Sequence, residues 1–321
     1  MRQSKTQEIT LPQLHLSAEE IENLFAPYVI SRPVGAEDLN WQTEKDRRAQ
    51  KYRKKFWRRR FLDFVPSLGR TTPKIEEEYN EVWDRTVLDS YKLPNAEPSE
   101  QPWEWGDKHY VAHRFGGARV RIAVLMRVIE QLKPASVLEV GCGNGVNLFY
   151  LAGRFPQINF TGIELTEAGN RTARKCQEQW EQFPEELLPF SPLPQLDRAA
   201  FRRIDFQKGS AASLPFADNS FDLVITVLAL EQMERIRRQA LSEISRVSSN
   251  HVLMIEPFRD VNEHGIRRHY VVTRNYFSAR TSDLPRYGLE PQWMISDFPQ
   301  KVQMQFACVL ARKKQTGAKT A

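Results

Sequence analysis

The stretch that begins at Ser136 reads SVLEVGCGNGVNLFYLAG, which is an apolar strand pattern, three glycines at alternate positions and an apolar helix pattern. Gly141, Gly143 and Gly145 leave the backbone of the turn without side chains, and a bare backbone is typical of a turn that a ligand approaches closely. A strand, a turn and a helix in this order form one unit of a layered α/β fold. The stretch therefore predicts both a fold class and the place of a binding site.

From about residue 103 the chain alternates strand and helix patterns. The expected helices cover 117–132, 147–155, 166–183 and 231–247, and the expected strands cover 136–140, 158–165, 204–207, 221–230 and 251–258. The run FDLVITVLAL is apolar on both faces, as in a central parallel strand. Residues 291–298 and 302–313 alternate apolar and polar side chains, which predicts an antiparallel hairpin at a sheet edge. The expected fold is a doubly wound, seven-stranded, mostly parallel sheet with a C-terminal antiparallel hairpin.

The first hundred residues differ in texture from the rest. Ser17 followed by Glu20 predicts a capping box at the start of a short helix, and the extension as a whole is expected to be mainly helical. We expect three parts, which are a locally basic N-terminal extension over 1–102, the α/β domain over 103–313 and a disordered tail over 314–321. The Pro-rich residues 185–200 predict a loop with a helical turn.

A dense group of positive charges stands inside the extension. Nine Lys or Arg residues fall within positions 47–60, interleaved with Tyr52, Phe56 and Trp57. One interpretation is a basic amphipathic helix that meets an anionic membrane surface, a nucleic acid or an acidic partner over residues 47–65. The other is a solvated helix whose aromatic stripe packs on the main domain, because Lys and Arg stems often cover apolar surface.

Composition narrows the class of protein. Hydrophobic residues make up 41% and charged residues 27% of the 321 residues, as in an ordinary globular protein. The longest apolar run is about half of the roughly 20 residues that a membrane span requires, and the N-terminus lacks the apolar core of a signal peptide, so we expect a cytoplasmic protein. Cys142, Cys176 and Cys308 show no metal-ligand spacing, and we expect no metal site. The net charge of +6 alone does not indicate nucleic-acid binding.

The spacing of the glycines bears on the ligand. A dinucleotide site requires G-x-G-x-x-G, but here the third glycine comes one residue early and Val146 stands in the place of the last glycine. Glu139 at the end of the strand would repel a pyrophosphate. Its carboxylate suits a ligand that carries an ammonium group and a sulfonium charge.

With these residues the sequence resembles the class I S-adenosylmethionine-dependent methyltransferases, from about Gly117 to Lys313. The resemblance implies that Glu139 and the three glycines hold the methionine part of S-adenosylmethionine, and that Glu164, at the end of the next strand, binds the ribose hydroxyls. The string LPFADNSFDLV, which begins at Leu214, matches the family's lead into the fourth strand, and the terminal hairpin matches its antiparallel strand pair. Further cofactor contacts are implied for Leu165, Ser210, Ala211 and Leu228.

Two positions depart from the family's pattern. Many members carry Gly-Asp-Ala before the fourth strand, where the Asp accepts a hydrogen bond from the adenine amino group, but this chain has Ser210 in that place. A serine hydroxyl can also accept, although it is shorter and neutral. Members often have Glu-His after the fourth strand, and this chain has Gln232 instead of the histidine.

Methyl transfer from a sulfonium needs alignment of the nucleophile and exclusion of water, and a general base is optional. If the acceptor is a hydroxyl, the candidates for a base are Glu256, His264 and His269. Arg267, Arg268 and Arg274 are candidates to clamp an anionic group of a substrate, and surface arginines explain them equally well. For the segment around Tyr110, His113 and Arg119, contact with the cofactor's carboxylate and ordinary packing of the extension are both open.

The leading hypothesis is methyl transfer to oxygen or nitrogen of a small molecule, which the arginines allow to be anionic. The place after the fourth strand reads LALEQM and lacks the Asn/Asp-Pro-Pro-aromatic string that grips a flipped base. Methylation of ribose or guanine in RNA stays open as an alternative. A third hypothesis is a cofactor-binding module without activity that serves an interaction of the basic extension.

Overall fold

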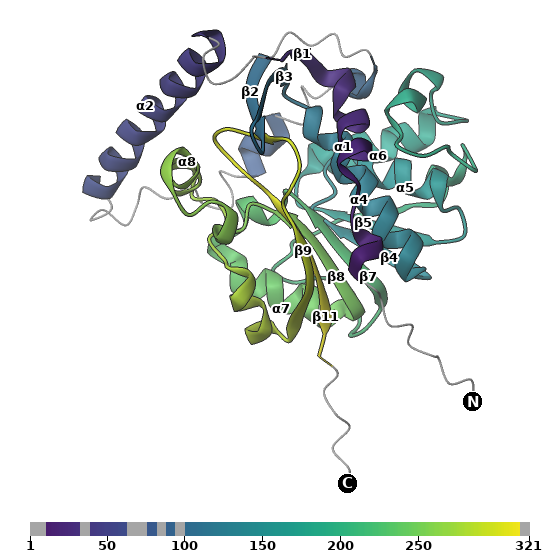
Figure 1. Ribbon diagram of the computed structural model, residues 1–321. Helices are drawn as coiled ribbons and strands as arrows, with labels where there is room; N and C mark the ends of the chain where they lie inside the picture. The colour runs from purple at the N-terminus through teal and green to yellow at the C-terminus, as the bar shows by residue number, and fades with distance from the viewer. Residues whose placement is uncertain (1–10, 33–38, 63–75, 82–87, 94–99, 315–321) are drawn as a thin grey trace.

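The computed structural model describes residues 11–32, 39–62, 76–81, 88–93 and 100–314. These ranges form a layered α/β body with a smaller sheet and a long helix at its side (Figure 1). The expected tail lies outside the described residues except for Lys314, whose N–H donates to the Gly288 carbonyl at 2.8 Å. The division at residues 102 and 103 stays a prediction.

The main sheet has seven strands in the order β6-β5-β4-β7-β8-β11-β9. The strands are β4 Ser136–Val140, β5 Asn159–Glu164, β6 Asp205–Lys208, β7 Phe221–Val227, β8 Ser248–Glu256, β9 Leu289–Ile295 and β11 Ala307–Lys313. The first five strands run parallel to one another, and β11 lies antiparallel between β8 and β9. The predicted fold class, including the antiparallel hairpin at the edge, is confirmed.

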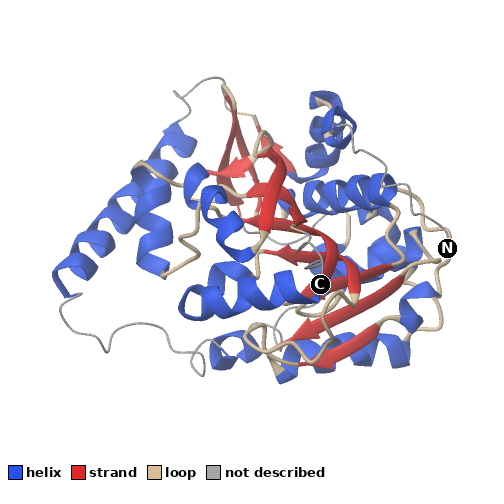
Figure 2. Ribbon diagram, turned by 90° about the horizontal axis from the view of Figure 1, so that it is seen from below, coloured by secondary structure: helices blue, strands red, loops and turns tan. Residues whose placement is uncertain are grey.

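Helices cover both faces of this sheet, as Figure 2 shows. α4 (Gly116–Leu132) and α5 (Val146–Arg154) pack on one face, with α6 (Glu167–Gln179) beside them, and α7 (Arg237–Val247) packs on the other. In β7, Leu223 and Ile225 belong to the core with α4 and α5, whereas Val224 belongs to the core with α7. Both faces of the strand are thus buried, which explains its continuous apolar run.

Two predicted boundaries around β7 are wrong. The strand was expected to reach residue 230, but it ends at Val227 because Leu228 takes a φ of +51°. The helix expected from residue 231 begins only at Arg237, after two short 3-10 turns, η7 (Leu230–Gln232) and η8 (Glu234–Ile236). The chain therefore turns sharply at the carboxyl end of β7, beside the glycine-rich loop.

A second sheet that the sequence did not predict joins distant parts of the chain. Its order is β1-β3-β2-β10, with β1 Val29–Ser31, β2 Glu100–Trp105, β3 Lys108–His113 and β10 Gln300–Lys301, all antiparallel. β2 and β3 are joined by the two-residue turn Gly106-Asp107, in which Gly106 has a φ of +58°. Figure 1 shows this sheet above the carboxyl ends of the main sheet.

The helices of the extension pack on the α/β body. α1 (Ala18–Phe25) begins with the predicted capping box, in which the Glu20 N–H donates to Ser17 Oγ at 3.1 Å and the Ser17 N–H donates to the Glu20 carboxylate at 2.7 Å. α2 (Leu39–Leu62) lies beside α8 (Gly265–Arg274), a helix in the arginine-rich stretch that the sequence did not predict (Figure 1). Among the described helices, none combines the length and apolar character needed to cross a bilayer.

Candidate active site

The glycine-rich loop joins β4 to α5 at the carboxyl edge of the sheet. Gly141, Gly143 and Gly145 have φ values of +76°, +55° and +77°, a region that favours glycine because it has no Cβ. The N–H groups of Gly141 and Cys142 donate to the Ile163 carbonyl at 2.8 and 3.2 Å. The loop is thereby fixed to the end of β5.

The space around two of these glycines is filled by protein. A Cβ on Gly141 would lie 2.6 Å from the Ala229 Cβ, and a Cβ on Gly145 would lie 2.5 Å from the Phe206 Cζ. At Gly141 and Gly145 the space that a Cβ would take is therefore filled by protein, and their contact with a cofactor stays a prediction. Backbone conformation and close packing explain both positions.

A cavity of about 300 Å³ opens over this loop. Seven of the predicted cofactor-binding residues line it, namely Gly141, Gly143, Glu164, Leu165, Ser210, Ala211 and Leu228. The other two, Glu139 and Gly145, are not among its lining residues. The rest of the wall includes Tyr79, Tyr91, Arg121, Asn144 and Asn147, none of which sequence reasoning singled out.

Glu164 at the end of β5 is held by three donors. One carboxylate oxygen accepts from the Gly143 N–H at 3.0 Å, and the other accepts from the N–H and hydroxyl of Thr166 at 2.9 and 2.7 Å. The residue is only 6% exposed. The carboxylate is thus fixed at the cavity wall, and its oxygens have lone pairs left for a ligand hydroxyl.

Glu139 lies behind the loop and is 1% exposed. Its Oε1 accepts from the amide of Asn147 at 2.7 Å, whereas its buried Oε2 has no hydrogen-bond partner within the described part of the chain. Burial raises the pKa of Glu139 to about 8, against the opposing effect of the Asn147 hydrogen bond. The Asn144 side-chain nitrogen is also buried without a partner among the described residues.

The predicted general bases lie away from this cavity. The Glu256 carboxylate is fully buried and accepts from the N–H groups of Ala229, Leu230 and Glu231 at 3.0 to 3.2 Å. It anchors the η7 turn, which contributes to the cavity wall. His264 precedes α8, and the His269 ring lies 4.7 Å from the Phe56 ring of α2. None of Glu256, His264 and His269 lines the cavity, so their catalytic role stays a prediction that the geometry does not favour.

Other candidates also have partners elsewhere. The Arg119 side chain donates to the Phe190 carbonyl at 3.2 Å, and the Tyr110 hydroxyl donates to Glu22 at 3.4 Å. Arg267 pairs with Glu104 and donates to the Gln305 side chain at 2.6 Å. In the described ranges, no three His, Cys, Asp or Glu side chains gather in a way that could hold a metal ion.

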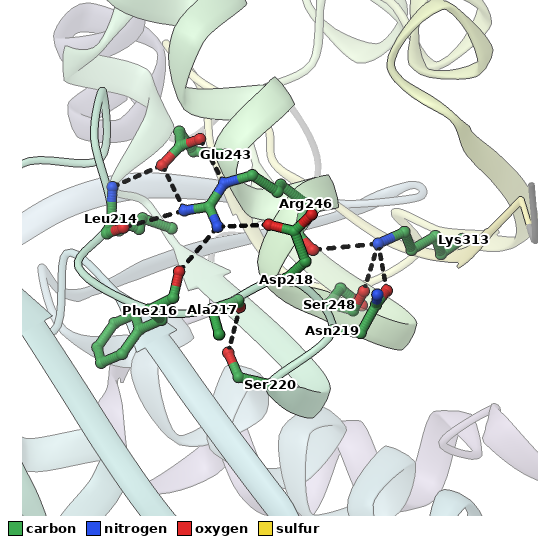
Figure 3. A network of polar contacts seen from close by, with 10 residues as sticks. All are labelled: Leu214, Phe216, Ala217, Asp218, Asn219, Ser220, Glu243, Arg246, Ser248 and Lys313. Atoms are coloured by element: carbon green, nitrogen blue, oxygen red, sulfur yellow. Dashed lines mark hydrogen bonds and ion pairs between the residues drawn. The ribbon is translucent and has the colours of Figure 1, made fainter.

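The string that begins at Leu214 has a structural role, which Figure 3 shows. Arg246 of α7 donates to the carbonyls of Leu214 and Phe216 at 3.0 and 2.8 Å and pairs with Asp218 at 2.8 Å. Glu243 holds the same guanidinium at 2.7 Å and accepts from the Leu214 N–H at 2.7 Å. The turn that leads into β7 is therefore fastened to α7.

The geometry can be compared with known proteins. Residues 138–255 match the model of a family described as a methyltransferase domain. This match covers the glycine-rich loop, Glu164 and the segment that begins at Leu214. The matched residues belong to the sheet with the strand order β6-β5-β4-β7-β8-β11-β9. This chain contains a class I methyltransferase domain.

Two curated relatives resemble this methyltransferase domain. The phthiotriol/phenolphthiotriol dimycocerosates methyltransferase of Mycobacterium tuberculosis is 29% identical over 166 residues, which cover 51% of this chain and 50% of that protein. The fatty-acid O-methyltransferase of Mycolicibacterium smegmatis is 31% identical over 111 residues, which cover 35% of this chain and 32% of that protein. The matches span about half the length of these relatives or less.

A solved structure supports the fold. The [4+2]-cyclase SpnF aligns with a TM-score of 0.54 and 18% identity, over 77% of this chain and 97% of that one. At this level of identity the likeness concerns the fold alone, because one fold supports different chemistries.

Proposed function

We propose that this protein transfers a methyl group from S-adenosylmethionine to an oxygen of an apolar small molecule. The observation that carries the proposal is the cavity over the glycine loop, which joins the Glu164 carboxylate with the bare backbone of Gly143. Oxygen is favoured over nitrogen by the names of two relatives, the fatty-acid O-methyltransferase and a probable tocopherol O-methyltransferase of rice. An apolar acceptor agrees with these names and with the lipid-like substrate named for the M. tuberculosis relative.

The residues present fit the cofactor. Glu164 would accept from its ribose hydroxyls, and the unpartnered Oε2 of Glu139 would meet the positive charge of its amino-acid end. The unpartnered amide of Asn144 would donate to an acceptor on the same end. Ser210, Ala211 and Leu228 would border the adenine, although the Ser210 Oγ already accepts from the Ala212 N–H at 3.2 Å.

When bound, the cofactor supplies an electrophilic methyl group on a sulfonium. The chain's own part is to hold both reactants in line and to exclude water. The wall from Leu228 to Met233 serves this purpose, because Glu256 fixes its backbone through three hydrogen bonds. The side chains of Tyr91, Met233 and Ile236 give the cavity an apolar side for the acceptor.

Calorimetry with S-adenosylmethionine and S-adenosylhomocysteine tests the cofactor, and NAD serves as the competing ligand. Glu164→Gln should weaken binding by about tenfold to a hundredfold, since a charge-assisted hydrogen bond contributes about 1.5–3 kcal/mol. Glu167→Gln is the control, because Glu167 follows on α6 and pairs with Lys208 at 3.2 Å on the surface. Heat with NAD and none with either sulfur ligand would refute the proposal.

Transfer of a labelled methyl group to lipid extracts tests the acceptor. We expect labelled product in the apolar fraction, stable to ribonuclease and protease. Label that appears only in RNA would support the alternative of an RNA methyltransferase, and binding without any transfer would support an inactive cofactor-binding module.

We also propose that α2 meets an anionic membrane surface. Tyr52 and Phe56 of this helix face α8, with the Tyr52 and Tyr270 rings 4.8 Å apart. The solvent-exposed part of the helix carries Trp57, which is 50% exposed, and the basic residues Lys51, Arg53, Lys54, Lys55, Arg58 and Arg60. A basic helix face with a tryptophan suits the headgroup region of a bilayer, which is where an apolar acceptor would be met.

A further inference from the structure

A cation lies in the wall of the cavity, in addition to the expected cofactor residues. Arg121 of α4 lines the cavity, and its guanidinium carbon stands 5.3 Å from the centre of the Phe306 ring. In the described ranges, the guanidinium makes no ion pair and no hydrogen bond, and its contact with the Phe306 ring is a cation–π contact. Burial lowers the pKa of Arg121, yet an arginine stays charged.

A second cation stands close to the first. Lys301 of β10 is the cross-strand partner of Trp103 in β2, and its ammonium lies 5.5 Å from the centre of the Trp103 ring. The Trp103 ring and the Arg121 guanidinium both lie next to Gly117. A Cβ built on Gly117 would be 3.4 Å from Trp103 Cη2 and 3.1 Å from Arg121 Nη1. Lys301 also lacks a carboxylate within 4 Å among the described residues.

The surroundings do not balance these charges. Burial and the charge of Arg121 lower the pKa of Lys301 to about 8, with Arg114 and Arg48 adding to the repulsion. Glu231 is the carboxylate that most offsets these shifts, and its effect does not outweigh burial. Partly buried cations that find no paired anion in the described ranges are unfavourable, and their retention indicates an anionic ligand.

We propose that Arg121 and Lys301, here called the cationic pair, receive an acidic group of the acceptor molecule. The acceptor would then be an apolar acid, with its carboxylate at the cationic pair and its apolar part along Tyr91, Met233 and Ile236. The inference rests on the proposed function and specifies the substrate class of the same site. A guanidinium that holds a carboxylate through two parallel hydrogen bonds gives both orientation and discrimination against neutral analogues.

The cofactor also carries a carboxylate, so the experiment must separate the two sources. Full-length protein is saturated with S-adenosylhomocysteine and titrated with butyrate, octanoate and dodecanoate, and with the alcohols of equal chain length. At least one acid should bind tenfold or more tightly than its alcohol. If no acid of the series binds more tightly than its alcohol, the proposal is overturned.

Variants locate the acid. Arg121→Met should weaken binding of the preferred acid by about twentyfold or more and leave the affinities for its alcohol and for S-adenosylhomocysteine within twofold. Lys301→Met should have a smaller effect in the same direction. Arg127→Met is the matched control on α4, because Arg127 pairs with Glu20 at 2.6 Å and lies outside this cavity.

The opposite pattern overturns the inference without touching the proposed function. If Arg121→Met weakens S-adenosylhomocysteine and spares the acid, the cation serves the cofactor. If the wild type binds no S-adenosylhomocysteine at all, the proposed function itself has failed.

Unfolding midpoints distinguish a specific loss of binding from a loss of binding that is caused by misfolding of a variant. Removal of a partly buried charge that has no ion pair in the described ranges should raise the unfolding midpoint of ligand-free Arg121→Met above that of the wild type. The preferred acid should raise the midpoint of the wild type and not that of Arg121→Met. A lower midpoint for ligand-free Arg121→Met would show that the guanidinium has a stabilising partner, which contradicts the inference.

Discussion

Glu139 makes cofactor binding dependent on pH in a way that can be measured. Burial raises the pKa of its carboxyl to about 8, so at pH 7 about nine tenths of the ligand-free protein carries this group protonated. A cationic ligand beside the unpartnered Oε2 would favour the ionised form. Binding at pH 7 should therefore release about 0.9 proton from Glu139. As the pH is raised towards 8, the affinity should increase by up to tenfold for each pH unit.

Calorimetry in two buffers with different heats of ionisation measures this proton. S-adenosylhomocysteine is titrated at pH 7 in phosphate and in Tris, and the difference between the observed enthalpies gives the number of protons released. Glu139→Gln should release about 0.9 proton fewer than the wild type and show a flat pH profile of affinity. Equal proton release by wild type and Glu139→Gln would refute the reasoning.

Glu256→Gln is the matched control. Glu256 is as deeply buried, and burial together with the nearby Glu231 also raises its pKa to about 8, but its oxygens face the backbone of η7 instead of the cavity. Its replacement should leave the proton release on binding unchanged.

Stability without ligand gives a second measurement of Glu139. A carboxyl whose pKa is higher in the folded than in the unfolded chain stabilises the fold at low pH and loses that contribution as the pH rises towards 8. Urea unfolding should show a loss of roughly 1 kcal/mol for each pH unit between about 5 and 8 from this group. Glu139→Gln should reduce that slope, and an unchanged slope would contradict the raised pKa.

Three further predictions concern the loop, the network of Figure 3 and α2. Gly145→Ala should lower the free energy of unfolding by about 2 kcal/mol or more, because the φ of +77° and the Phe206 ring both oppose a Cβ. Gly143→Asp should instead abolish cofactor binding and leave a folded domain. An unchanged stability of Gly145→Ala, or cofactor binding by Gly143→Asp, would contradict these expectations. Arg246→Met should cost about 2–4 kcal/mol in urea unfolding, since it leaves Glu243 and two carbonyls without their donor, against less than about 0.5 kcal/mol for the exposed Arg286→Met control. Sedimentation with vesicles of phosphatidylglycerol should bring down the wild type at low salt, less so Trp57→Ser, and neither with phosphatidylcholine alone; equal sedimentation with both lipids would exclude an electrostatic contact.

The main sheet could be predicted because its signals are local. Parallel strands buried on both faces read as short apolar runs, and β4, β5 and β7 are each followed by a helix of regular periodicity. The start of α6 near residue 166 was also predicted, although the helix ends at Gln179 instead of residue 183 because the backbone of Trp180 is extended. The end of β7 could not be predicted, because the left-handed backbone conformation there falls on Leu228. A glycine at that position would have signalled the turn, and leucine does not.

The smaller sheet was missed for a different reason. Its strands come from residues 29–31, 100–113 and 300–301, and only the β2–β3 pair is local. The dipeptide Gly106-Asp107 between alternating aromatic residues was a usable hairpin signal. β1 and β10 are too short to be recognised without their partners.

The candidate site was predictable in its cofactor half and not in its acceptor half. Glu164 and the glycines stand at fixed places after strands, so their positions follow from the order of the elements. Arg121 is one of 46 Lys and Arg residues in the chain, and its distinction is that it lines the cavity, partly buried, without an acidic partner in the described ranges. Only the packing of α4 beside Trp103 and Phe306 reveals this.

The alternating glycines first suggested a ligand, but the fold itself already requires glycine at two of the three positions, Gly141 and Gly145. A Cβ on Gly141 would clash with Ala229, and a Cβ on Gly145 would clash with Phe206. Glycine would therefore be required at both positions even in a protein that binds no ligand. The weight of the cofactor argument therefore shifts to groups whose contacts within the described chain are incomplete, such as the buried Oε2 of Glu139. The same criterion, applied to Arg121 and Lys301, places the complementary negative charge on the acceptor. Within the described ranges, the buried Oε2 of Glu139 lacks a hydrogen-bond partner and the partly buried Arg121 and Lys301 lack an ion pair, and two reactants of opposite local charge are the best explanation of both.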